Sequence, residues 1–200
     1  MDGELFRWIM AGAHVLVMPV AAYHRIRSQA SGERLDRRQE GWAVLLLLRP
    51  FGLAAMVGLV TYMIRPSSMA WASLPLPLWL RWLGVVSLAI GGGLLAWTLH
   101  TLGPNLTDTV VTRRSHTLVT SGPYHWVRHP FYDAAALWIF GNALAAANGF
   151  VLATGAVAAM WLIIRTRREE ANLLARFGGH YQAYTARTGR FLPGVGKSRP

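Results

Sequence analysis

Five long apolar segments follow one another along the 200-residue chain, and they constrain its fold more than any other feature. An α-helix rises 1.5 Å per residue, so about 20 apolar residues cross the ~30 Å hydrocarbon core of a bilayer. We expect membrane helices at residues 5–23, 42–64, 78–99, 131–147 and 150–164. The sequence therefore predicts an all-α integral membrane protein with about five transmembrane helices and short cytoplasmic helices in its C-terminal tail.

The composition agrees with a membrane protein. Hydrophobic residues make up 53% of the chain and charged residues only 14%, against roughly 25% charged residues in soluble domains. A formal net charge of +11 would suggest nucleic-acid binding in a soluble protein. Most of the arginines lie between apolar segments, where anionic lipid is their natural partner, so we expect the membrane and no nucleic acid. Cysteine is absent, and His14, His24 and His100 lack ligand spacing, so we predict no metal site.

Arginine placement also predicts the orientation of the chain. Groups of arginines follow the first, third and fifth expected helices, whereas the opposite loops hold only Arg65 and Arg81. Cytoplasmic loops are rich in Lys and Arg, so five helices place the N-terminus outside and the C-terminus in the cytoplasm. The first residues, Met1-Asp2-Gly3-Glu4, carry acids where a signal peptide carries bases, so we expect the first helix to be retained. A bias toward Ala, Arg and Gly indicates a bacterial inner membrane.

The C-terminal half contains two polar segments that are too long to be simple connections, at residues 101–130 and 165–200. Between them, only Asn148 and Gly149 separate the last two expected helices, which predicts a tight antiparallel hairpin. In the tail, apolar residues recur at helical spacing over residues 169–177, and the two glycines at 178–179 supply a stop. A second short helix is expected at residues 180–187.

Two groups of motifs in this half carry the functional information. The first reads His116-Thr-Leu118-Val119-Thr-Ser-Gly122-Pro123-Tyr124-His-Trp-Val-Arg128-His129-Pro130-Phe-Tyr132. The second reads Arg165-Thr-Arg-Arg-Glu169-Glu170, followed by Phe177-Gly178, Tyr181, Tyr184 and Arg190-Phe-Leu-Pro193. Together with Leu102-Gly103-x-Asn105, they resemble the isoprenylcysteine carboxyl methyltransferase family and its relatives among phospholipid methyltransferases. The resemblance covers about residues 102–193, nearly half of the chain.

The resemblance implies a membrane methyltransferase that uses S-adenosyl-L-methionine. It divides the chain into a three-helix transmembrane framework, residues 1–100, and a catalytic half, residues 101–200, with a cofactor loop, a transmembrane hairpin and cytoplasmic tail helices. The cofactor-binding residues that it implies are His116, Leu118, Val119, Gly122, Pro123, Tyr124, His129, Pro130, Tyr132, Glu169 and Glu170. The expected catalytic residues are Arg128, Glu170 and Arg165.

Elementary chemistry is consistent with these assignments. Methyl transfer from a sulfonium is an in-line displacement, which needs positioned reactants and no metal. Carboxylates and aromatic faces are natural neighbours of a positive sulfonium, and Glu169, Glu170 and several tyrosines provide both. Arg128 and Arg165 can each bind a carboxylate with two parallel hydrogen bonds.

Simpler explanations exist for several of these residues. Arg165 and Glu169 are four residues apart and could form an ion pair on a solvated helix face. Pro130 is expected to begin a helix whatever the function, because proline is tolerated in the first turn. His116 is either a surface polar group or part of the cofactor border.

The expected acceptor is lipophilic and membrane-resident, and it would arrive sideways from the bilayer between helices. A carboxylate acceptor is already a nucleophile, whereas an amine needs a base, for which Glu170 and His129 are candidates. Two alternatives remain. One is an NADPH-dependent membrane reductase with a related C-terminal layout, using Arg113, Arg114, Arg167 and Arg168 for the 2′-phosphate. The other is a non-catalytic membrane protein that keeps the fold.

Two charged residues in the apolar segments have open roles. Arg49 could line an acceptor cavity or satisfy carbonyl groups that Pro50 leaves free. Asp133 could be a first-turn acid stabilised by the helix dipole or a partner for Arg128. Relatives usually carry a small residue or a hydroxyl at the position of Asp133, followed by a glycine, so this departure bears on acceptor specificity.

Overall fold

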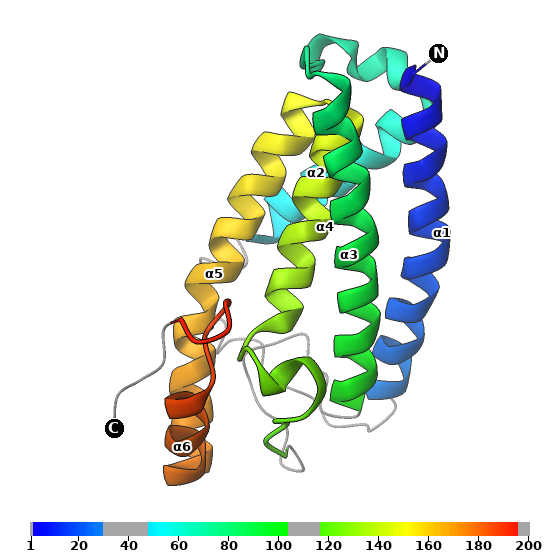
Figure 1. Ribbon diagram of the computed structural model, residues 1–200. Helices are drawn as coiled ribbons and strands as arrows, with labels where there is room; N and C mark the ends of the chain where they lie inside the picture. Colours follow the sequence, from blue (N-terminus) through cyan, green and yellow to red (C-terminus); the bar gives the residue numbers. More distant parts are fainter. Residues whose placement is uncertain (1, 30–47, 104–116, 196–200) are drawn as a thin grey trace.

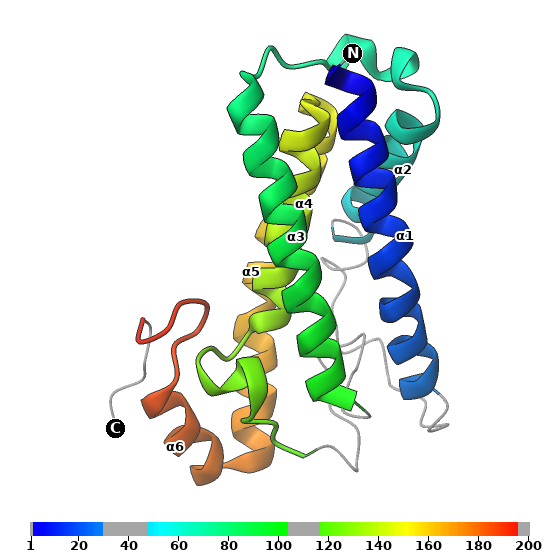
Figure 2. The same cartoon turned by 45° about the vertical axis from the view of Figure 1, so that its right-hand side comes forward.

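The computed structural model describes residues 2–29, 48–103 and 117–195, and this part of the chain contains helices, the loops that connect them and two isolated β-bridges. Its α-helices and 3₁₀-helices (η) follow in this order: α1 (Asp2–Gln29), α2 (Arg49–Ile64), η3 (Pro66–Ala72), α3 (Leu78–Leu102), η5 (Gly122–His125), α4 (Pro130–Ala146), α5 (Gly149–Phe177) and α6 (Gly179–Arg187). Figure 1 and Figure 2 show α1, α3, α4 and α5 standing side by side as an upright bundle. The N-terminus and η3 lie at one end, and η5, α6 and the C-terminal tail lie at the other.

Helices form at all five of the expected apolar positions. Three of them, α1, α3 and α5, are long and apolar enough to cross a membrane, while α2 is a shorter apolar helix of 16 residues and α4 has 17 residues. The expected start of the second helix, residues 42–47, lies outside the described residues. Arg49 is the first residue of α2 and its side chain is exposed. The membrane assignment is confirmed in its coarse form: an all-α chain with helices able to span a bilayer.

Tryptophans mark the two ends of α3. Trp79 and Trp82 are exposed near its start, and Trp97 is exposed near its end beside Trp126 of the neighbouring loop, with ring centroids 5.6 Å apart. Trp79 and Trp97 are separated by about 27 Å along the helix axis. Since tryptophans gather at both membrane–water interfaces, this separation fits a helix that crosses the hydrocarbon core.

The predicted hairpin between α4 and α5 is confirmed. Pro130 begins α4 in its first turn, and α4 ends at Ala147, whose left-handed φ of 48° reverses the chain. Asn148 then caps α5, because its side-chain oxygen accepts a hydrogen bond from the backbone nitrogen of Val151 at 3.1 Å. The amide nitrogen of Asn148 also donates to the carbonyl oxygen of Met69 in η3, so one buried side chain closes the turn of the hairpin.

The prediction of a short fifth helix followed by a separate tail helix is wrong. A single helix, α5, runs for 29 residues from Gly149 through Phe177. The stretch after residue 155 contains neither glycine nor proline, and Arg, Glu, Leu and Ala are strong helix formers. The helix ends only at Gly178, where φ is +51°. The expected second tail helix is confirmed as α6.

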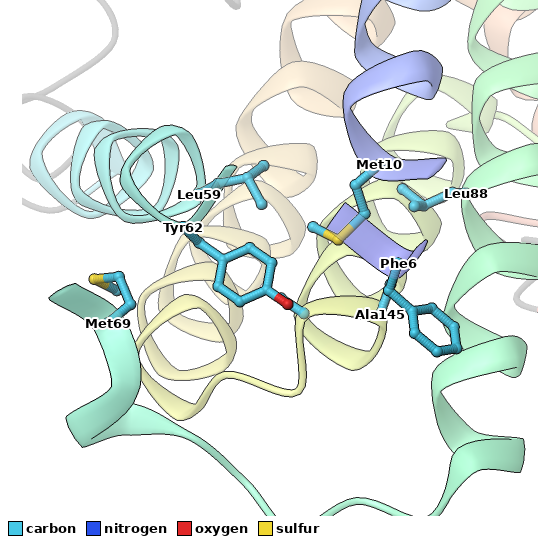
Figure 3. Packing of buried hydrophobic residues seen from close by; sticks show 8 residues of the cluster. Phe6, Met10, Leu59, Tyr62, Met69, Leu88 and Ala145 are labelled. Carbon is cyan, nitrogen blue, oxygen red and sulfur yellow. The ribbon is translucent and has the colours of Figure 1, made fainter. Parts of the chain in front are cut away.

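A buried apolar cluster holds the end of the bundle that carries the N-terminus. Figure 3 shows α1, α2, η3, α3 and α4 each contributing to it, and its members are Phe6, Met10, Leu59, Tyr62, Met69, Leu88, Ala145 and Ala146. Arg81 of α3 donates two hydrogen bonds, of 3.1 and 2.9 Å, to the carbonyl oxygen of Ala145 and lies 4.0 Å over the Phe6 ring. This cluster anchors the helices at the end opposite α6.

The contact between α3 and α4 depends on glycines. A β-carbon added to Gly84 would lie 2.6 Å from the backbone nitrogen of Ala145 and 2.8 Å from the carbonyl oxygen of Gly141. One added to Gly91 would lie 3.0 Å from the backbone nitrogen of Trp138. Small residues let membrane helices approach backbone to backbone. Gly84 and Gly91 therefore allow α4, which begins directly after His129, to pack closely against α3.

Candidate active site

Glu170 of α5 joins three basic side chains at the end of the bundle that carries α6. Its Oε1 accepts hydrogen bonds from Nε of Arg128 at 2.9 Å and from Nε of Arg190 at 3.1 Å, and it lies 3.1 Å from Nε2 of His129. A second nitrogen of Arg190 donates to Oε2. The two motif groups therefore meet in space, although Arg128 and Glu170 are 42 residues apart in the chain.

This environment holds Glu170 in its charged form. Glu170 lies beyond residues 150–164, the part of α5 that we expect inside the bilayer. Burial alone would raise the pKa of its carboxyl, but the hydrogen bonds from His129, Arg190 and Arg128 outweigh burial and hold the pKa well below its usual range. A carboxylate with so low a pKa is a poor proton acceptor near neutral pH.

Arg128 also fastens α6 to the site. One of its terminal nitrogens donates to the carbonyl oxygens of Thr188, at 2.6 Å, and Thr185, at 3.3 Å. These carbonyls lie at the C-terminal end of α6, where a helix has unsatisfied acceptors and partial negative charge. The guanidinium is buried, and its printed hydrogen bonds join α5 to the end of α6.

Tyrosines connect the remaining parts of the site. The hydroxyl of Tyr132 in α4 donates to Glu169 of α5 at 2.6 Å. The hydroxyl of Tyr184 in α6 donates to the carbonyl oxygen of Tyr124 in η5 at 2.7 Å, and burial raises the pKa of Tyr184 to about 12. Tyr181 is only 3% exposed, and its hydroxyl has no hydrogen-bond partner among the described residues.

The C-terminal tail pairs with the segment that precedes α4. The backbone nitrogens of Arg128 and His129 donate to the carbonyl oxygens of Gly189, at 2.8 Å, and Arg190, at 3.1 Å. This pairing places the side chain of Arg190 beside Glu170. The sequence indicates Arg190 only as part of a terminal motif. It does not predict the contact with Glu170, because the two residues are 20 positions apart in the chain.

Gly189 permits this pairing because a side chain does not fit there. An added β-carbon would lie 1.8 Å from the carbonyl oxygen of Leu192 and 2.8 Å from that of Val195. We predict that Gly189→Ala releases the tail from residues 127–129 and increases the rate of limited proteolysis after residue 187 by about tenfold. Gly179→Ala is the matched control, since a β-carbon there meets nothing within 4 Å. Equal cleavage of the two variants would contradict this account of the tail.

The remaining predicted residues lie around the same end or outside the described part. Gly122 and Pro123 open η5, and position 122 favours glycine both because its φ is +57° and because an added β-carbon would lie 2.7 Å from the hydroxyl oxygen of Thr101. Leu118 and Val119 are half-buried in the segment before η5. Arg165 is half-buried one turn before Glu169. The predicted residues outside the described part are His116, Asn105, Arg113 and Arg114.

An open groove of about 540 Å³ borders this cluster of charges. It is lined mainly by apolar side chains from α3, η5, α4 and the tail, namely Ser87, Leu94, Trp97, Pro123, Trp126, Val127, Pro130, Asp133, Ala136, Leu137, Phe140, Phe191, Leu192 and Pro193. Phe191 lines the groove and lies beside the charged cluster, since its ring centroid is 5.7 Å from that of His129. Of the two roles considered for Asp133, partnership with Arg128 is not seen, because Arg128 binds Glu170 instead.

No three metal-ligating side chains lie together within residues 2–29, 48–103 and 117–195. The described site therefore consists of carboxylates, guanidinium groups, tyrosines and an adjoining apolar groove.

Comparison with known proteins indicates the family to which this region is similar. The sequence profile described as the isoprenylcysteine carboxyl methyltransferase (ICMT) family matches residues 82–175, from α3 to the Glu169–Glu170 segment of α5. Residues 82–175 belong to the isoprenylcysteine carboxyl methyltransferase family. The family assignment made from the motifs is thus confirmed, and the matched region includes Arg128, Tyr132 and Glu170.

Individual relatives carry the same name. Protein-S-isoprenylcysteine O-methyltransferase of Homo sapiens is 33% identical over 127 residues, which is 62% of this chain and 44% of the human protein. The Xenopus laevis protein of that name is 34% identical over 119 residues, 58% of this chain and 41% of the relative. Protein-S-isoprenylcysteine O-methyltransferase B of Arabidopsis thaliana is 27% identical over 154 residues, 76% of this chain and 77% of the relative. The chain spans less than half the length of the two vertebrate relatives.

A solved structure shows the same fold. The eukaryotic intramembrane Ras methyltransferase ICMT superposes with a TM-score of 0.59 at 23% identity, covering 95% of this chain and 68% of the other. The similarity therefore extends beyond the matched profile into the N-terminal helices.

Proposed function

We propose that this protein transfers a methyl group from S-adenosyl-L-methionine to a lipophilic acceptor in the membrane. The observation that carries the proposal is the convergence of the Arg128–Tyr132 segment on Glu169 and Glu170, through the contacts of Arg128 and His129 with Glu170 and of Tyr132 with Glu169. The match of residues 82–175 to a methyltransferase family supports it independently.

The residues at this end fit the proposed cofactor. Carboxylates and tyrosine rings suit a sulfonium cation, and the buried, unpartnered hydroxyl of Tyr181 offers a donor or acceptor to a polar ligand. The residues that would hold the cofactor are the sequence-predicted set His116, Leu118, Val119, Gly122, Pro123, Tyr124, His129, Pro130, Tyr132, Glu169 and Glu170. Bound there, S-adenosyl-L-methionine would supply an electrophilic methyl group on a positively charged sulfur.

The protein's own residues would position the reactants. Glu170, held ionised by its three basic neighbours, keeps Arg128, His129 and Arg190 together and is too weak a base to deprotonate an acceptor. Arg165, half-buried one turn before Glu169, remains the candidate for orienting a carboxylate on the cofactor or the acceptor. The apolar groove beside His129 suits an acceptor that diffuses in from the lipid.

The membrane arrangement is part of the same proposal. Five transmembrane helices, with the N-terminus outside and the site on the cytoplasmic face, place the arginine-rich segments on one side. The composition favours a bacterial inner membrane. The relatives' names specify an isoprenylcysteine acceptor, and a lipophilic tail of that kind suits the groove.

Cofactor binding in detergent tests the proposal. Isothermal titration calorimetry of the parent is expected to detect S-adenosyl-L-methionine and no comparable binding of NADPH. Tyr132→Phe, which removes one hydroxyl that binds Glu169, is expected to weaken cofactor binding about tenfold. Glu170→Gln and His129→Ala should weaken it further.

The control is Tyr23→Phe, which removes an exposed hydroxyl bound to Arg27 on α1 and is expected to bind like the parent. Thermal unfolding of each variant separates lost binding from lost folding. Tight NADPH binding, or unchanged affinity in both Glu170→Gln and His129→Ala, would contradict the proposed function.

A further inference from the structure

Asp133 is the one ionisable side chain among those that line the groove. It lies in the first turn of α4, and its carboxyl accepts no hydrogen bond within the described part of the chain. Its neighbours in the groove wall, Pro130, Ala136 and Leu137, are apolar. A carboxyl group in such a wall lacks the partners that buried polar groups normally have.

Opposing effects act on a negative charge at Asp133, and the nearby His129 is the ionisable side chain that interacts with it. The N-terminal turn of a helix stabilises negative charge through the helix dipole. An apolar, half-buried setting nevertheless penalises an unpaired carboxylate. A ligand that brings a cation or a strong hydrogen-bond donor to this point removes the penalty, whereas a second carboxylate increases it.

The groove sets where such a ligand would place its head and its tail. Trp97 and Trp126, which line the groove and contact each other, mark the level of the membrane interface. Leu94, Leu137 and Phe140 continue the lining away from that level, into the apolar part of the bundle. A chain-like lipid therefore fits with its tail along α3 and α4 and its head near Asp133.

We propose that Asp133 determines acceptor specificity by binding the protonated amine head of a long-chain lipophilic acceptor and accepting one proton from it, which frees the nitrogen lone pair to attack the methyl group as the bond from that carbon to the donor sulfur breaks. This inference rests on the proposed methyl transfer and narrows its acceptor class. It differs from the carboxyl acceptor in the description of the matched family, because a carboxylate at the same point would face Asp133 directly.

Two matched lipids test the proposal: hexadecylamine and hexadecanoic acid, which share the same chain length and differ in the head group. Their affinities for the detergent-solubilised protein are measured by titration at neutral pH. We expect the parent to bind the amine at least about tenfold more tightly than the acid, the scale expected for a desolvated charge pair.

Variants at position 133 test whether the negative charge of Asp133 causes the preference for the amine. Asp133→Asn keeps the size and can donate a hydrogen bond to a carboxylate, so it is expected to bring the two affinities within about twofold. Asp133→Glu keeps the charge and is expected to retain the preference for the amine. Glu4→Gln, which neutralises an exposed acid paired with Arg7 on α1, controls for the loss of one negative charge.

A parent that binds the acid as tightly as the amine, or an Asn variant that keeps the preference, would overturn the role of Asp133. Binding of S-adenosyl-L-methionine, measured in the same samples, tests the underlying function separately. A parent that prefers the amine but binds no cofactor would support the assignment of Asp133 and contradict methyl transfer. Transfer of a labelled methyl group to the acid in preference to the amine would support methyl transfer and contradict the assignment.

Discussion

Glu170→Ala is expected to destabilise the end of the bundle that carries α6 by about 3 kcal/mol, because it leaves two buried basic groups without their shared carboxylate. Arg128 and His129 are 8% and 3% exposed, so water cannot replace the lost partner. The tail should loosen as well, since Arg190 loses its hydrogen bonds to Glu170. Thermal unfolding in detergent and hydrogen exchange of residues 179–195 measure the effect.

The control for this prediction is Glu4→Ala. Glu4 pairs with Arg7 at 2.8 Å, but its side chain is 57% exposed, and exposed ion pairs contribute little, about 0–1 kcal/mol. The pH dependence gives a second check. Because folding lowers the pKa of Glu170, its stabilisation is present above about pH 4.3, the ordinary glutamate value, and is lost as the pH falls below it. The difference between parent and Glu170→Ala should therefore shrink in acid.

Gly84→Ala is expected to cost about 3 kcal/mol or more by forcing α3 and α4 apart. The added methyl group would lie 2.6 Å from the backbone nitrogen of Ala145, and a helix backbone cannot rotate away as a side chain can. Overpacking a tight contact typically costs 1–3 kcal/mol, and a backbone contact lies at the upper end. Thermal unfolding in detergent or resistance to denaturant measures the loss.

Gly93→Ala is the matched control on the same helix. A β-carbon at Gly93 meets nothing within 4 Å, so this variant should be as stable as the parent or slightly more, because alanine favours a helix over glycine by about 1 kcal/mol. Equal stability of the Gly84 and Gly93 variants would show that the two helices do not approach as closely as described.

The local features of the fold were readable from the sequence. Pro130 begins α4, and Asn148 closes the hairpin, because both act through chemistry confined to one turn of the chain. The continuity of α5 does not follow from hydropathy, because the residues change from apolar to charged at Arg165 while the helix continues to Phe177. Helix propensity stays high through Arg165. Only the environment of the helix changes there.

The candidate site, too, was only partly predictable from the sequence. The motifs indicated that the Arg128 and Glu170 segments belong together, but the partners of each side chain depend on tertiary geometry. The contacts of Arg128 with the carbonyls of Thr185 and Thr188 involve backbone atoms, which carry no residue-type signal. The place of Asp133 in the groove required the relative positions of α3, α4 and the tail.

The unbroken course of α5 links the site to the lipid itself. Its 29 residues extend about 43 Å, well beyond a ~30 Å hydrocarbon core. A rigid helix responds to a thicker or thinner bilayer by tilting, and α5 has no glycine or proline between Gly155 and Phe177 at which it could bend instead. If α5 spans the bilayer as proposed, we expect acyl-chain length to change the angle and depth at which Glu169 and Glu170 meet the head-group layer.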